Sequence, residues 1–332
     1  MTMAKDTALL EVENMRVHFT IRSGTLAGGA RIVRAVDGVS FRVNAGTTFG
    51  IVGESGSGKT TTALSAMRLA PVTSGEIRLK GRNISGLEGR ALQAIRRDMQ
   101  IIFQDPFSSL DPRRRAGALI REPLDRLRIG TTAERNARVQ ELLSLVGLRP
   151  EQATLFPHQF SGGQRQRLCI ARALASKPDL IVCDEPVSAL DVAIQAQVLN
   201  LLRRLQKELG VTYLFISHDL GVVQHMCDEI AVMYLGRIVE QASRKDLFDD
   251  PQHPYTRALL SAVPSIENVD RDITDRVKLQ GDPPSPLNPP SGCPFHTRCR
   301  YVQAKCRTDV PALRQWRGDH RAACHFAGQL DG

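Results

Sequence analysis

The chain has 332 residues, 42% of them hydrophobic, and a formal net charge of +9. This length and apolar content predict a folded globular protein with one large domain and a smaller one, and they exclude an extended disordered chain. Because the N-terminal residues lack a continuous apolar segment and no window approaches about 18 apolar residues, we expect neither a secretory signal nor a membrane-spanning helix, and hence a cytosolic protein with reduced thiols.

Short runs in which apolar and polar residues alternate fill residues 9–50 and 75–86. Alternation with a period of two is typical of antiparallel strands that have one solvated face. We therefore expect an antiparallel β-subdomain in the first part of the chain, interrupted by a Gly-containing insertion at residues 23–30.

A phosphate-binding loop is predicted from Phe49 onward, where the sequence reads FGIVGESGSGKTTTALSAM. An apolar strand, 49–52, leads into the pattern G-x-x-x-x-G-K-[ST] and then into a helical stretch. Backbone N–H groups of such a loop turn around phosphate oxygens, Lys59 neutralises the β- and γ-phosphates, and Thr60 offers a hydroxyl to Mg²⁺. The predicted nucleotide-binding residues here are Gly53, Glu54, Ser55, Gly56, Ser57, Gly58, Lys59, Thr60 and Thr61.

A helical subdomain is expected over about 105–165. Thr131 and Glu134 have the spacing of a capping box at a helix start, and Gly147 is placed to end that helix. The apolar residues between them share one helical face, which packing accounts for; these are Val139, Leu142, Leu143 and Val146.

The run FSGGQRQR, residues 160–167, predicts the start of another helix. Ser161 is a good N-cap residue, and two glycines open the helix behind it. A helix N-terminus of this kind can bind an anion. One nucleotide does not need two such cradles from a single chain, so this second one calls for a separate explanation.

Two acidic residues end a second apolar run, Leu180-Ile181-Val182-Cys183-Asp184-Glu185. A buried parallel strand would deliver both carboxylates to the sheet edge where ligands bind in α/β folds, with Asp184 toward Mg²⁺ and Glu185 toward the attacking water. The alternative is that they cap a helix. A helix over 192–209 and a strand over 213–216 complete a βαβ pattern and therefore predict a parallel sheet.

The run FSGGQRQR resembles the signature motif of ABC-type ATPases, and other elements of that family follow in its order. The resemblance implies an α/β P-loop NTPase with a parallel core sheet, an antiparallel β-subdomain and a helical subdomain. It also implies that Gln104 is the Q-loop residue that touches the metal, and that His218 contacts the γ-phosphate. Residues of the signature and D-loop would reach the nucleotide of a dimer partner; these are Ser161, Gly162, Gly163, Gln164 and Asp191.

Two residues have a simpler alternative beside the role that the resemblance implies. Phe19 takes the place of the usual adenine-stacking tyrosine, and a phenylalanine ring can stack on a base or fill a core. His218 follows a strand, where a lone histidine is commonly a packed or capping residue.

The resemblance implies a motor that works with other subunits. Hydrolysis would require ATP, Mg²⁺ and a second ABC ATPase, either a paralogue or a second copy. The pair would dock on two transmembrane permease subunits and serve an extracytoplasmic solute-binding protein indirectly, which places this chain peripherally on the cytoplasmic side of the cell (inner) membrane. A soluble nucleic-acid-associated ABC ATPase is the distant alternative; we expect no nucleic acid, because that class generally carries two cassettes or a coiled-coil insertion.

The C-terminal part narrows the family. A stretch HPYTRALLSAVP, a Pro-rich segment at 281–290 and a cysteine-containing tail resemble the extension of ATPases from dipeptide, oligopeptide and nickel importers. We therefore divide the chain into a nucleotide-binding domain, 9–250, and an importer-type extension, 251–332. Di- or oligopeptides are the expected cargo, while nickel, glutathione and other small solutes stay open.

Four of the seven cysteines fall in this tail: Cys293, Cys299, Cys306 and Cys324. Their spacing matches neither common zinc sites nor ferredoxin runs. Nearby histidines keep zinc as an alternative, namely His296, His320 and His325, and unliganded thiols are a third. The resemblance implies a four-iron four-sulfur cluster, which could act as a staple for a small segment short of apolar residues. The remaining thiols are expected in the core; these are Cys169, Cys183 and Cys227.

Overall fold

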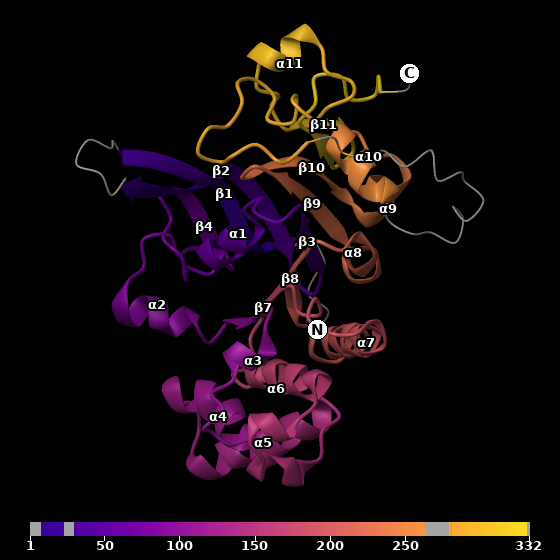
Figure 1. The fold of residues 1–332 in the computed structure, drawn as a ribbon. Helices are drawn as coiled ribbons and strands as arrows, with labels where there is room; N and C mark the ends of the chain where they lie inside the picture. Colours follow the sequence, from indigo (N-terminus) through magenta and orange to yellow (C-terminus); the bar gives the residue numbers. More distant parts are fainter. Residues whose placement is uncertain (1–7, 23–29, 263–278, 280, 331–332) are drawn as a thin grey trace. The chain divides into compact units, whose positions relative to one another are not determined.

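The computed structural model describes residues 8–22, 30–262, 279 and 281–330 (Figure 1). The chain divides into two compact units. The first comprises Met1–Leu9, Val43–Thr48 and Leu79–Ile216, and the second comprises Leu10–Arg42, Phe49–Arg78 and Ser217–Gly332. The predicted insertion lies outside the described residues, except for Ala30 at the start of a strand.

The first unit contains the predicted βαβ arrangement. Strands β6 (Met99–Ile102), β7 (Leu180–Asp184) and β8 (Thr212–Ser217) are parallel neighbours in the order β6-β7-β8. Helix α7 (Val192–Leu209) connects β7 to β8 and ends at Gly210, whose φ of 70° is left-handed. All residues of β7 and β8 are buried, which explains why both read as continuous apolar runs.

Helices dominate the rest of the first unit, as predicted for residues after 105. The capping box is present: Thr131 Oγ1 accepts the Glu134 N–H at 3.3 Å, and Glu134 Oε2 accepts the Thr131 N–H at 2.7 Å. Gly147 follows with a φ of 75°, so the helix ends where the sequence predicts. The remaining elements are β5 (Arg82–Asn83), α2 (Gly89–Ile95), α3 (Pro106–Ser109), α4 (Ala116–Arg126), α5 (Thr132–Leu145), η1 (Pro150–Thr154), η2 (Pro157–Gln159) and α6 (Gly162–Leu174).

The second unit has its own sheet and the predicted phosphate-binding segment. Strand β3 (Thr48–Val52) pairs in parallel with β9 (Glu229–Tyr234), which pairs antiparallel with β10 (Arg237–Ser243). Helix α1 (Lys59–Ala66) follows β3, and α8 (Leu220–Met226) precedes β9. Every residue of β3 is buried, so the strand anchors the loop that leaves its C-terminal end.

A separate sheet in the second unit confirms the expected β-subdomain. Its neighbouring strands are β2 (Ala30–Asn44), β1 (Ala8–Arg22) and β4 (Ser74–Leu79), in that order. Seven residues join β1 to β2, and a parallel pair would need a crossover of about a dozen residues or more. The two strands are therefore antiparallel.

The C-terminal extension, residues 251–332, continues the β10 sheet. Strand β12 (His320–Ala322) pairs antiparallel with β10, and β11 (Arg314–Arg317) pairs antiparallel with β12. Helix α9 (Arg244–Asp249) precedes the extension, which contains α10 (Pro254–Ser261) and α11 (Ala304–Thr308). The Pro-rich segment 281–290 forms neither helix nor strand, as its proline density predicts.

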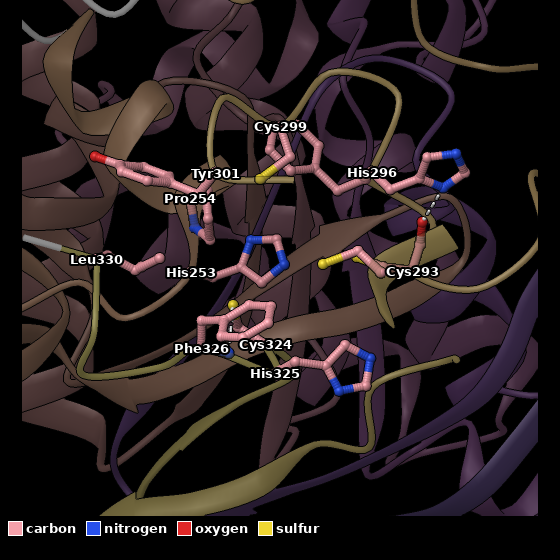
Figure 2. Close-up of a pocket in the computed structure, with 12 residues that line it drawn as sticks. His253, Pro254, Cys293, His296, Cys299, Tyr301, Cys324, His325, Phe326 and Leu330 are labelled. Carbon is pink, nitrogen blue, oxygen red and sulfur yellow. Dashed lines mark hydrogen bonds between the residues drawn. The ribbon is translucent and has the colours of Figure 1, made fainter. Parts of the chain in front are cut away.

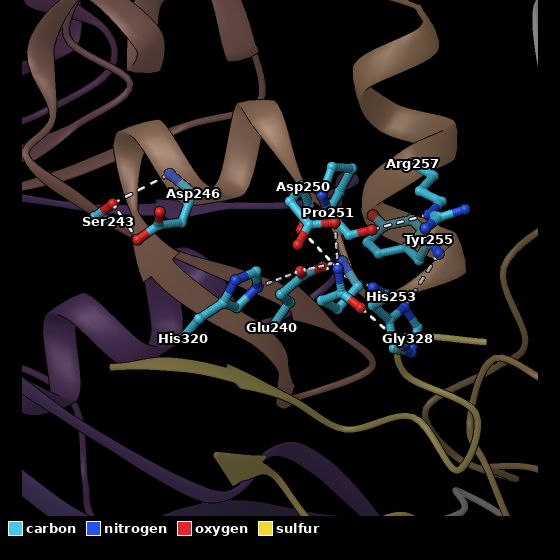
Figure 3. Close-up of polar contacts among 11 residues, drawn as sticks. Glu240, Ser243, Asp246, Asp250, Pro251, His253, Tyr255, Arg257, His320 and Gly328 are labelled. Atoms are coloured by element: carbon cyan, nitrogen blue, oxygen red, sulfur yellow. Dashed lines mark hydrogen bonds and ion pairs between the residues drawn. The ribbon is translucent and has the colours of Figure 1, made fainter. Parts of the chain in front are cut away.

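Glu240 of β10 ties both ends of the extension to the sheet (Figure 3). This residue is fully buried. Its carboxylate accepts the backbone N–H of Gln252 at 2.5 Å and that of His253 at 2.9 Å, and it lies 2.8 Å from Nε2 of buried His320. A buried carboxylate is stable only with such partners, so the extension and β10 form one packed structure. Among the described residues, none of the helices combines the length and apolar character that crossing a bilayer requires.

Candidate functional site

The predicted phosphate-binding loop leaves β3 at Gly53 and runs to Gly58, the N-cap of α1, and Lys59 and Thr60 are the first two residues of that helix. Gly58 has a φ of 99°, and a Cβ atom there would lie 2.3 Å from the carbonyl oxygen of Ala35, so only glycine fits. Gly56 also has a left-handed φ, of 76°, but no atom lies within 4 Å of its Cβ position. The loop is thus packed on one side and open at Gly56.

Lys59 is buried, and its Nζ donates hydrogen bonds to the carbonyl oxygens of Gly53, at 2.8 Å, and Glu54, at 2.9 Å. The ammonium therefore folds back over the loop, where both of these bonds go to backbone carbonyl oxygens. Such bonds can be exchanged for the stronger charge-assisted bonds to phosphate oxygens.

The second unit supports this loop from outside the motif. The Ser57 carbonyl accepts the Gly236 N–H at 2.9 Å. The Glu54 N–H donates to Tyr255 Oη at 2.9 Å, and the Glu54 carboxylate forms a two-pronged pair with Arg298, at 2.7 and 3.0 Å. Hydrogen bonding to Glu54 raises the pKa of the Arg298 guanidinium. Sequence reasoning missed the roles of Tyr255 and Arg298, because no local pattern indicates contacts with residues 201 and 244 positions away.

The HPY stretch that the sequence singled out forms the start of α10. His253 is its N-cap and accepts the Tyr255 N–H through Nδ1 at 3.1 Å, while Pro254 occupies the first turn, where no amide donor is needed. Burial lowers the pKa of His253 to about 3, so the ring is neutral. This start of α10 aims the Tyr255 hydroxyl at the loop.

The predicted acidic pair belongs to the first unit. Asp184 is the last residue of β7 and is buried, and Glu185 follows with a left-handed φ of 47°. Gln104 Nε2 donates to Glu185 Oε2 at 2.9 Å, so the structure brings the predicted Q-loop residue and the predicted water-activating residue together. The helix-cap alternative is wrong, because Asp191 caps α7 by accepting the Ile194 N–H at 2.9 Å.

The second predicted cradle, at Ser161, has the expected form. Ser161 Oγ accepts the Gln164 N–H at 3.3 Å, and Gln164 Oε1 accepts the Ser161 N–H at 3.0 Å. Gly162 and Gly163 form the first turn of α6. A Cβ on Gly163 would lie 2.6 Å from Cγ2 of Ile194, so the glycine also allows α6 to pack closely on α7.

The simpler alternatives for two residues are wrong. Phe19 is 39% exposed on β1, so its ring does not belong to the core. His218 is exposed directly after β8, and the residue that caps α8 is Asp219. Adenine stacking by Phe19 and phosphate contact by His218 stay predictions.

Four thiols of the extension line one cavity of about 20 Å³; they belong to Cys293, Cys299, Cys306 and Cys324. Figure 2 labels three of them, Cys293, Cys299 and Cys324. His253 and His325 line it too. His320 bonds Glu240 instead. Among the residues that the structure describes, no three His, Cys, Asp or Glu side chains are close enough to hold one metal ion, so the thiols surround a space rather than converge on a point.

Burial raises the pKa of Cys293 and of Cys299 to about 11, and the other thiols add to this effect. The pKa of Cys324 is raised for the same reason. Thiolates at these positions therefore need a compensating cation, which iron or zinc would supply. The three other cysteines are buried in the core, as predicted.

Comparisons with known proteins agree on one family. A model described as "ABC transporter" matches residues 36–188, and one described as "Oligopeptide/dipeptide transporter, C-terminal region" matches residues 239–306. The oligopeptide transport ATP-binding protein AppF of Bacillus subtilis is 49% identical over 327 residues, which is 98% of this chain and 99% of that protein. A putative peptide import ATP-binding protein of Brucella ovis is 53% identical over 319 residues, 96% of this chain and 98% of the relative.

Solved structures show the same fold. The ATP-binding cassette MJ0796, solved as a dimer in a post-hydrolysis state with ADP and Pi, matches with a TM-score of 0.62 and 30% identity, over 71% of this chain and 98% of that one. The protein cbiO1 from Clostridium perfringens, part of the ABC transporter complex cbiONQ, matches with a TM-score of 0.62 and 26% identity. This match covers 74% of this chain and 92% of cbiO1.

Proposed function

Because the chain belongs to the ATP-binding subunits of ABC transporters, we propose that its ATP hydrolysis drives the import of di- or oligopeptides. The cargo assignment rests on the match to the oligopeptide/dipeptide transporter C-terminal region at residues 239–306. The alignment with AppF supports it, because it covers 98% of this chain and 99% of AppF. The family and the P-loop α/β fold predicted from the sequence are confirmed. Nickel, glutathione and other small solutes are the alternative cargoes, which the uptake experiment described below distinguishes from peptides.

The loop 53–61 would hold the nucleotide phosphates. Binding requires Lys59 to exchange the two carbonyls that it now contacts for phosphate oxygens. The oxygen donors of Thr60, Gln104 and Asp184 are the kind that Mg²⁺ prefers. When bound, Mg²⁺ neutralises charge on the phosphates.

Glu185 would take the proton from the attacking water, and His218 would donate to the γ-phosphate. The bond from Gln104 fixes the orientation of the Glu185 carboxylate, which supports a positioned base rather than a mobile surface acid. Phe19, exposed on β1, would stack on the adenine.

The signature residues 161–164 and Asp191 would serve the nucleotide of a partner subunit in a head-to-tail dimer. The dimeric MJ0796 cassette supports this arrangement. The dimer would dock on two transmembrane permease subunits at the cytoplasmic face of the cell membrane, and a solute-binding protein would act through them.

Replacing Glu185 with Gln tests the mechanism. We expect Glu185→Gln to bind ATP, to form an ATP-dependent dimer in light scattering, and to hydrolyse ATP about 10²-fold to 10⁴-fold more slowly, the usual contribution of a general base. The matched control is Glu208→Gln, an exposed residue of α7 that keeps the wild-type rate. A wild-type rate in Glu185→Gln would disprove its role.

The cargo is tested in source cells whose only copy of the gene carries Glu185→Gln. We expect uptake of a labelled dipeptide or pentapeptide to stop while uptake of ⁶³Ni²⁺ and of labelled glutathione continues. Loss of nickel or glutathione uptake with normal peptide uptake would assign that cargo instead.

We further propose that the four-cysteine cavity holds a four-iron four-sulfur cluster. Four thiols around one space are the donor set of such a cluster. When bound, the cluster would cross-link four points of the extension. Anaerobic purification followed by iron, sulfide and zinc analysis tests this: we expect equal iron and sulfide, lost in Cys293→Ser but kept in the matched core variant Cys227→Ser. One zinc per chain, or no metal, would contradict it.

A further inference from the structure

Glu54, inside the phosphate-binding loop, is held at three separate points. Its carbonyl oxygen accepts from Lys59 Nζ at 2.9 Å, its N–H donates to the Tyr255 hydroxyl at 2.9 Å, and its carboxylate pairs with Arg298 at 2.7 and 3.0 Å. One of these partners is the lysine that must meet the phosphates. The other two belong to the C-terminal extension.

Arg298 is well suited to hold a fixed position. Its side chain is only 5% exposed, whereas that of Glu54 is 27% exposed. Two parallel N–H···O bonds between a guanidinium and a carboxylate set direction as well as distance. The arginine is thus the immobile partner, and the loop residue is the one that it restrains.

The position of Arg298 depends in turn on the four-cysteine segment. The residue precedes Cys299, and its N–H donates to the Phe295 carbonyl at 3.0 Å. The Phe295 ring is buried against Tyr234 and Tyr255, with centroids 5.3 and 5.4 Å apart. One aromatic cluster therefore holds both groups that reach Glu54.

We propose that Arg298 and Tyr255 are positioning residues of the phosphate-binding loop, and that they make the affinity for MgATP depend on the folded state of the segment around the four cysteines. The proposal rests on the proposed nucleotide role of the loop, but it does not depend on which metal the cysteines bind. A segment that loosens would release Glu54, and the loop would lose part of its ordering before ATP arrives.

Coupling of this kind is reciprocal. If the ordered segment strengthens nucleotide binding, bound nucleotide must stabilise the segment by the same free energy. Hydrogen exchange of residues 293–308 should therefore slow when MgATP is added, although none of these residues belongs to the phosphate-binding motif.

The test is a double-mutant cycle on the dissociation constant for MgATP, measured with the full chain by calorimetry. We expect Arg298→Met to raise the Kd about fivefold to tenfold, within the usual range of coupling between linked sites. The Kd of Arg298→Lys should lie between those of the wild type and Arg298→Met, because lysine keeps the charge without the two-pronged geometry. In a Glu54→Gln background, Arg298→Met should have little further effect. In hydrolysis assays the KM for ATP should rise while kcat is unchanged.

Two controls distinguish this coupling from a general effect of mutating the segment and from failure of the loop's nucleotide role. Arg300→Met changes an exposed arginine of the same segment and should leave the Kd and the cysteine metal content at wild-type values. If Lys59→Ala binds MgATP as well as the wild type does, the nucleotide role of the loop fails, which is a different result from failure of the coupling.

Two results would overturn the proposal. The coupling is refuted if folded Arg298→Met binds MgATP within twofold of the wild type, or if MgATP leaves hydrogen exchange of residues 293–308 unchanged. If Arg298→Met does not fold, Tyr255→Phe removes a single hydroxyl, and we expect a rise in Kd of about fivefold, at the low end of such coupling. A wild-type Kd in that variant would equally refute the proposal.

Discussion

The buried carboxylate of Glu240 gives a sharp prediction for how the extension is held. Its Oε1 lies against the Gln252 N–H and His320 Nε2, and its Oε2 lies against the His253 N–H. In Glu240→Gln, one carboxylate oxygen becomes an NH₂ group, so a donor must face at least one donor. A lost bond to a charged group together with an unsatisfied buried amide costs about 3 kcal/mol.

This loss should appear locally rather than across the chain. A local opening that is about 3 kcal/mol easier corresponds to an increase of roughly a hundredfold in hydrogen exchange. We expect it in peptides that contain Gln252 and His253 and in β12, measured by mass spectrometry. The matched control is Asp249→Asn, an exposed acid at the end of α9, which should change stability by no more than about 0.5 kcal/mol. An effect of Glu240→Gln below about 1 kcal/mol would refute the reasoning.

Two further predictions concern Glu229 and Gly163. Burial raises the pKa of Glu229 above its ordinary value of 4.5, so the wild type loses stability as the pH rises from 4.5 through the raised pKa; Glu229→Gln should lack this loss and be more stable at pH 7 in urea unfolding. Gly163→Ala should cost about 1–3 kcal/mol by overpacking against Ile194, and a second change, Ile194→Ala, should restore stability. If hydrolysis returns as well, packing is the only role of Gly163; if it stays low in the stable double variant, the backbone there serves the nucleotide.

Local pattern predicted the elements and the motifs well. The helix 192–209 has the bounds that the sequence indicated, and Ser161 and Thr131 cap their helices as expected. Each of these features depends on residues within a few positions of one another. Periodicity, capping and loop chemistry are short-range effects, so a single sequence contains them.

Long-range pairs were beyond such reasoning. Glu240 and His320 are 80 residues apart, and Glu54 and Arg298 are 244 residues apart. Nothing near Glu54 distinguishes it from the other variable positions of the loop motif. The C-terminal sequence also lacks the alternation of apolar and polar residues that would have predicted β11 and β12, because both strands are short and β11 is exposed throughout. Only the folded chain brings these residues together.

The same contacts predict that the extension cannot be removed cleanly. Cutting the chain after residue 250 would delete Gln252, His253 and His320, so the Glu240 carboxylate would lose these three partners. Strand β10 would also become an edge with unpaired backbone groups, which promotes association between chains. We expect the 1–250 fragment to aggregate in light scattering, although it retains the whole phosphate-binding loop. The full chain with Cys293→Ser is the control, because it keeps β12. A monomeric, folded fragment that binds MgATP with the wild-type Kd would refute this expectation and, with it, the positioning role of Arg298 and Tyr255.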